Sequence, residues 1–108
     1  INLYGTLAGV YRNLGKYSKA KEYYTKDIEL TKQQYGENHY SVATSYNNLA
    51  WLYIDKKDYE NAEKYFKKSL SVKLDVLPNN HPDVAITYHN IGYFYYKWDN
   101  PPQSFKNY

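Results

Sequence analysis

Cysteine is absent from this 108-residue chain, which excludes disulfide bonds and metal sites built on thiolates. No apolar run approaches the roughly 20 residues that are needed to cross a bilayer. No stretch combines the basic start and the apolar centre of a signal peptide. The net charge of +3 is too small an excess to indicate a nucleic-acid partner. We therefore expect an intracellular, cytoplasmic protein that has no membrane partner.

Motifs for catalysis are also missing, because the sequence contains no nucleophile elbow, phosphate-binding loop or zinc-protease signature. His39 and His81 could suggest a metal, but neither has a second ligand at close spacing. A zinc site needs about three or four converging ligands. The sequence thus predicts neither an enzyme nor a cofactor.

Tyrosine is abundant, with 16 residues, and ten of these recur at an interval of 42 residues. Such a period is the signature of a repeat architecture. Two columns of tyrosine are Tyr4, Tyr46 and Tyr88, and Tyr11, Tyr53 and Tyr95. Two columns of small residues accompany them: Ala8, Ala50 and Gly92, and Ala20, Ala62 and Ser104. Small residues in both helices of a pair let the two backbones approach closely, so we expect these columns to be the core of helical hairpins.

Apolar residues at three- and four-residue steps predict helices over about 1–14, 17–35, 42–53, 59–77 and 84–95. A last helix should start near Pro101, with Asn100 as its cap, and carry Phe105 and Tyr108. Gly15 is expected to end the first helix, and Asp58 to cap the fourth.

These columns resemble the tetratricopeptide repeat, whose pattern is an aromatic residue, Leu, Gly or Ala, Tyr, a second Ala, and Phe or Tyr. The 42-residue period, with His81-Pro82-Asp83-Val84-Ala85 and Asn47-Asn48-Leu49-Ala50, resembles the kinesin light chain type. The resemblance implies an all-α fold, a right-handed α-α superhelix of antiparallel hairpins with two and a half to three repeats. One array would fill residues 1–108, with repeats at about 1–40, 41–82 and 83–108, as part of a longer solenoid. Asp27 departs from the pattern, because the family prefers alanine in its column.

The resemblance also implies a concave groove lined by the first helix of each repeat, where a partner protein or peptide binds. The relatives present an asparagine to the backbone of a bound peptide at the positions of Asn48 and Asn90. Trp51 would be an apolar anchor, or would pack against the next repeat. The full set of expected groove residues is Asn48, Asn90, Asn47, Trp51, His89, Tyr93, Tyr96, Arg12, Asn13 and Lys97.

Positive charge at Arg12 and Lys97 favours acidic peptides, although Asp55 offsets part of it. A clamp for chaperone tails is not expected, since only Asn48 of its residue set is present. Two other functions stay open: a structural or regulatory segment of a larger protein, and self-association through the ends of the array. Binding of single-stranded RNA is disfavoured because the expected groove is of mixed charge.

Overall fold

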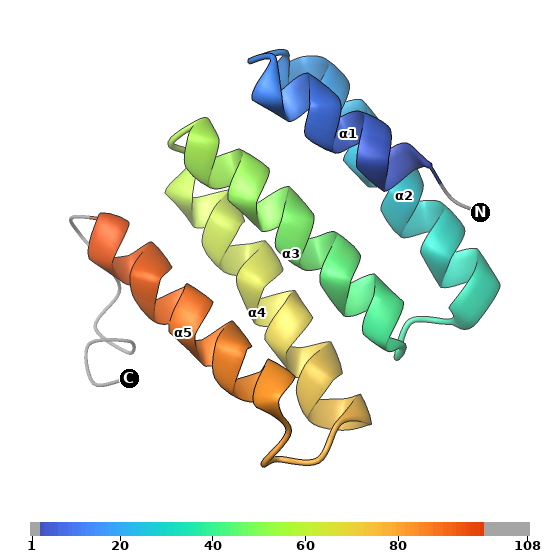
Figure 1. Cartoon of the computed structure of the whole chain (residues 1–108), viewed down its shortest axis with the longest axis vertical. Helices are drawn as coiled ribbons and strands as arrows, with labels where there is room; N and C mark the ends of the chain where they lie inside the picture. Colours follow the sequence, from blue (N-terminus) through green and yellow to red (C-terminus); the bar gives the residue numbers. More distant parts are fainter. Residues whose placement is uncertain (1–2, 99–108) are drawn as a thin grey trace.

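The computed structural model describes residues 3–98, and these form five α-helices without a β-strand (Figure 1). The helices are α1 (Tyr4–Asn13), α2 (Tyr17–Tyr35), α3 (Tyr40–Asp55), α4 (Tyr59–Val76) and α5 (Pro82–Lys97). The predicted all-α fold of helical hairpins is therefore confirmed. The predicted last helix, with Asn100, Pro101, Ser104, Phe105 and Tyr108, lies outside the described residues. No helix within residues 3–98 is long and apolar enough to cross a membrane.

The helix ends follow from local chemistry. Gly15 takes a φ of 76°, a left-handed conformation that ends α1 as predicted. Asp58 caps α4 by accepting a 3.4 Å hydrogen bond from the backbone N–H of Asn61. The two recurring histidines are also caps: His39 Nδ1 accepts from the N–H of Ser41 at 3.0 Å, and His81 Nδ1 from that of Asp83 at 3.1 Å. Capping accounts for the histidine repeat.

Within each hairpin, small residues and stacked tyrosines hold the two helices together. Ala8 on α1 and Ala20 on α2 are completely buried, so the backbones of these helices come close. Tyr23 on α2 lies against two tyrosines of α1, with its ring centroid 5.9 Å from Tyr4 and 5.5 Å from Tyr11. The second hairpin repeats this arrangement, with Tyr65 lying 5.9 Å from Tyr46 and 5.7 Å from Tyr53. Most of the tyrosine columns are thus structural.

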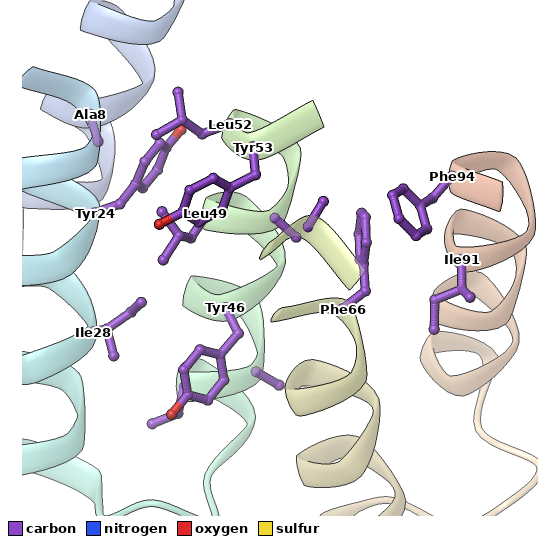
Figure 2. Close-up of a cluster of buried hydrophobic side chains, with 14 of the residues drawn as sticks. Ala8, Tyr24, Ile28, Tyr46, Leu49, Leu52, Tyr53, Phe66, Ile91 and Phe94 are labelled. Atoms are coloured by element: carbon purple, nitrogen blue, oxygen red, sulfur yellow. The ribbon is translucent and has the colours of Figure 1, made fainter. Parts of the chain in front are cut away.

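The hairpins α1–α2 and α3–α4 lie side by side, and α5 lies beside α4 at the far end from α1 (Figure 1). Leu49 and Tyr53 of α3 are buried in the same cluster as Tyr24 of α2 (Figure 2). Phe66 of α4 lies 5.4 Å from Phe94 of α5, ring centroid to ring centroid, which joins the second hairpin to the third repeat. A single apolar core therefore runs through the described helices.

One predicted core residue is exposed. Tyr88 shares a column with Tyr4 and Tyr46, yet half of its surface is open to solvent. In the first repeat, Tyr4 packs against Tyr23 from the second helix of its own hairpin. In the second repeat, Tyr46 packs against Tyr65 in the same way. The corresponding partner of Tyr88 would come from residues after 98, outside the described part, and no tyrosine stands at the matching position there.

Candidate functional site

Four of the ten predicted groove residues line one of two hollows. A polar pocket of about 530 Å³ lies where α1, α2 and α3 meet, and Asn48 is part of its wall. An apolar pocket of about 740 Å³ lies on α4 and α5, and it is bordered by His89, Tyr93 and Tyr96. The structure therefore brings some of the predicted residues together, but in two places of opposite chemistry.

The polar pocket is lined by hydroxyl, amide and carboxylate groups. Asp27 is the one charged residue in its wall, and only 8% of Asp27 is exposed. A Cβ atom on Gly5 would lie 3.5 Å from the Asp27 carboxylate, so α1 passes close over this side chain. The remaining wall residues are Thr6 on α1, Thr31, Gln34 and Tyr35 on α2, and Tyr40, Ser41, Thr44, Ser45 and Asn48 on α3.

Asn47 is the neighbour of Asn48 but has a different environment. Its Oδ1 atom is buried and has no hydrogen-bond partner within the described part of the chain. A buried polar atom without a partner destabilises the fold by about 1–3 kcal/mol. Asn47 is also absent from the walls of both pockets, so the two consecutive asparagines are not equivalent.

Trp51 belongs to an aromatic row that links α3, α4 and α5. Its ring meets Phe66 edge-on with the centroids 5.4 Å apart, and lies 6.1 Å from Tyr93. The ammonium of Lys97 lies over the ring of Tyr93 at 5.8 Å from its centroid. Trp51, Tyr93 and Lys97 therefore lie close together. Trp51 also packs against the next repeat, which was the alternative to a role as an anchor for a peptide.

The apolar pocket lies next to this row. Leu70 on α4 and Ile91 and Gly92 on α5 form its apolar wall, and Lys67 is the charged residue at its border. Tyr96 is the most exposed of the large apolar residues on the described helices, at 81%. The pocket can accept an apolar side chain or a further helix, because almost no polar group faces it.

One of the two cations that were predicted to favour acidic peptides is already paired. Arg12 on α1 forms a two-pronged ion pair with Asp55 on α3, and the Nη2–Oδ1 distance is 3.2 Å. The hydrogen bond to Asp55 raises the pKa of Arg12 above its ordinary value, against an opposing effect of burial. This pair joins successive repeats and leaves Lys97 as the other cation of that prediction.

Six of the ten predicted residues line neither pocket: Asn47, Trp51, Arg12 and Lys97, described above, and Asn13 and Asn90. Asn13 is exposed at the end of α1, and Asn90 is half-buried on α5. The sequence prediction also missed most of the polar pocket, because Asp27, Thr31 and Gln34 belong to the second helix of the first hairpin. The departure at Asp27 from the small-residue column was the one signal in the sequence for this pocket.

Comparison with known proteins supports the repeat assignment. Residues 1–75 match the family model of the tetratricopeptide repeat. No curated protein matches the chain. The crystal structure of BtubC (BKLC) from P. vanneervenii is similar, with a TM-score of 0.79 and 30% sequence identity. That match covers 91% of this chain and 39% of BtubC, so this chain spans less than half the length of that protein.

Proposed function

The chain belongs to the tetratricopeptide repeat family and is of the kinesin light chain type, and from this premise we propose that it binds an extended segment of a partner protein. The binding surface in this proposal is the groove along α1, α3 and α5. Its role is to hold a partner and not to catalyse a reaction, as expected for a repeat array with extended surfaces. Whole-protein activities are not implied, since the chain spans 39% of BtubC.

The observation that carries the proposal is the position of Asn48. Its side chain is half-buried on α3 and lines the polar pocket, where residues of α1, α2 and α3 meet. An amide both donates and accepts a hydrogen bond, so it can pair with the backbone of an extended peptide without reading its side chains. Asparagine is also a poor helix former, which makes a binding role a reason for its place in mid-helix.

Tyr93 on α5, which lies 6.1 Å from Trp51 on α3, extends this surface onto the third repeat. Tyr93 and Tyr96 offer large, rigid contact areas with a hydroxyl at the tip, as is common in protein interfaces. We infer that an apolar side chain of the partner segment lies against Tyr93 on α5 while Asn48 holds the backbone. Trp51 supports the surface through its contact with Tyr93.

Selection from an unbiased peptide library on the full chain tests the proposal. Selected peptides should bind Asn48→Ala about five- to thirtyfold more weakly, because one or two amide hydrogen bonds are lost. Asn80→Ala, which removes an exposed amide from the α4–α5 connector, is the matched control and should bind normally. Failure to enrich any peptide, or equal binding to Asn48→Ala, would remove the proposed function.

A second candidate function, contact with another hairpin, rests on α1. Leu7 and Val10 are 42% and 51% exposed, whereas their counterparts Leu49 and Leu52 are 2% and 0% exposed. The counterparts are buried because a hairpin precedes α3. An exposed apolar face of this kind marks an interaction surface. The partner would be either another hairpin of a longer array or a second copy of the chain.

Sedimentation velocity over a wide concentration range tests self-association through this face. Leu7→Glu should shift any oligomer to monomer, because a carboxylate cannot be buried without a partner. Leu30→Glu changes an equally exposed leucine on α2 and should not affect association. A wild-type chain that is monomeric at every concentration would contradict self-association.

A further inference from the structure

The polar pocket has an internal counterpart one repeat later, and the two differ in charge. Residues 42 positions apart are equivalent in the repeat. Ser69 therefore corresponds to Asp27, Lys73 to Thr31, and Thr87 to Ser45. The first repeat has a carboxylate and no lysine at these positions, and the second has a lysine and no carboxylate.

In the second repeat, the lysine fills the position between α4 and α5. Lys73 is only 7% exposed, and its ammonium donates a 2.8 Å hydrogen bond to the hydroxyl of Thr87. It also lies over the ring of Tyr40, 5.7 Å from the centroid. Asp83 is close enough to favour the charged form, and its carboxylate accepts a 2.5 Å hydrogen bond from Tyr40. The fold thus seats a cation among hydroxyl, aromatic and carboxylate groups at this position.

The first repeat has the same kinds of group without the lysine, but partly from other positions, since Ser41 stands where the second repeat has Asp83. Ser45 occupies the place of Thr87, the rings of Tyr35 and Tyr40 stand at the edge, and Asp27 adds a carboxylate to the wall. Threonine at position 31 is shorter than lysine by several atoms, which leaves an open pocket of about 530 Å³. No other charged side chain lines this pocket among the described residues.

We infer that the polar pocket accepts a cationic side chain, a lysine ammonium or an arginine guanidinium, from the bound partner segment. This inference rests on the proposed function, because it names the residue type that the groove selects. A guanidinium or ammonium can donate to the Asp27 carboxylate and to hydroxyls such as that of Ser45, and it can lie against tyrosine rings. The pocket therefore selects a basic residue in the partner, the reverse of the acidic preference expected from Arg12 and Lys97.

A small probe tests the pocket without a known partner. N-acetyl-arginine amide, titrated into the full chain, should shift the NMR signals of the Thr44 and Asn48 backbone amides, with a Kd on the order of 1 mM for a ligand of this size. N-acetyl-norleucine amide, which has no charge, should bind at least about tenfold more weakly. Equal binding of the charged and neutral probes would overturn the inference.

Two variants assign the effect to the pocket. Asp27→Asn keeps the shape of the side chain and should weaken binding of the arginine probe about tenfold, whereas Asp75→Asn, on the exposed side of α4, should leave it unchanged. Thr31→Lys copies the second repeat, and its own ammonium should block the probe. Unchanged probe binding in both pocket variants, with melting curves that show folded protein, would contradict the inference.

The peptide library separates this inference from the proposed function. Peptides that depend on Asn48 but contain no preferred basic residue would support the groove and reject the cation site. Probe binding that depends on Asp27, without any selected peptide, would support the cation site and reject the groove. Enrichment of lysine or arginine that is lost on Asp27→Asn supports both.

Discussion

The ammonium of Lys73 donates a 2.8 Å hydrogen bond to the hydroxyl of Thr87, and this contact joins α4 to α5. The hydroxyl of Thr87 in turn donates to the backbone carbonyl of Asp83 at 2.8 Å, so it keeps a partner without the lysine. Burying an ammonium carries a desolvation penalty, and the lowered pKa of Lys73 indicates that the hydroxyl of Thr87, the ring of Tyr40 and the nearby Asp83 do not fully offset it. The hydrogen bond between Lys73 and Thr87 therefore fixes α5 against α4 but lowers the free energy of unfolding.

We predict that Lys73→Met raises the free energy of unfolding by about 1 kcal/mol at pH 7, because methionine fills a similar volume without a charge. Urea denaturation followed by circular dichroism measures this change. Lys64→Met, on the exposed surface of α4, is the control and should change stability by less than about 0.5 kcal/mol. A loss of more than about 1 kcal/mol would show that the ammonium stabilises the array.

The advantage of Lys73→Met should depend on pH. Burial lowers the pKa of Lys73 below its ordinary value of 10.5, with an opposing effect of Asp83. Between the lowered pKa and 10.5 the unfolded chain binds more protons than the folded chain, so the stability of the wild type rises with pH relative to the variant. The difference between the two proteins should thus be largest near neutral pH and shrink toward pH 10.5. A difference that stays constant over this range would contradict the assignment.

Asn47→Ala provides a test of the unpaired amide. The substitution removes a buried oxygen without a hydrogen bond and adds a better helix former, so we expect stability to rise by about 1–3 kcal/mol. Asn48→Ala, whose amide borders the polar pocket, should give only the gain in helix propensity, about 0.5 kcal/mol. Thermal melting of both variants distinguishes the two environments. A loss of stability in Asn47→Ala would indicate that its amide has a partner in solution.

Trp51→Ala should destabilise the chain by about 2 kcal/mol, less than the cost of removing a fully buried tryptophan. The reason is its packing against Phe66 and Tyr93, which lie in two different helices. Tyr96→Ala removes an exposed ring and should leave stability within about 0.5 kcal/mol of the wild type. If Trp51→Ala were as stable as the wild type, Trp51 would be free to act as an anchor. Binding data on this variant therefore need a matching measurement of stability.

The sequence predicted the helices well because their pattern is local and repeated. A 42-residue period predicts directly the buried column of Ala8 and Ala50. It also predicts that Tyr23 and Tyr65 make equivalent contacts within their own hairpins. The exposure of Tyr88 among the described residues was not predicted, whereas Tyr4 and Tyr46 in the same column pack against Tyr23 and Tyr65 of the second helices. The period identifies positions that can be buried, but whether such a position is buried depends on the helix that packs next to it.

The candidate site was harder to predict because it depends on contacts between helices. Asn48 lines the polar pocket, but the carboxylate in the wall of that pocket comes from Asp27 on another helix. The pairing of Arg12 with Asp55, 43 positions apart in the sequence, neutralises one of the two cations on which the expected acidic preference was based. Only the one-residue departure from the repeat pattern at Asp27 pointed to this chemistry in advance.

The ends of α1 and α3 offer a reciprocal test of the repeat, because Gly15 and Lys57 occupy equivalent positions. Gly15 has a φ of 76° and Lys57 a φ of 61°, so both lie in the left-handed region that favours glycine. Lys57→Gly should stabilise the chain by about 0.5–1 kcal/mol. It relieves backbone strain of about 1 kcal/mol, and the greater entropy that glycine gives the unfolded chain offsets a small part of this gain. Gly15→Lys should destabilise it by a similar amount, and urea denaturation measures both changes. Lys56→Gly is the control: it introduces glycine at a right-handed position and should lower stability. If Lys57→Gly lowered stability as Lys56→Gly does, the left-handed turn after α3 would be absent in solution.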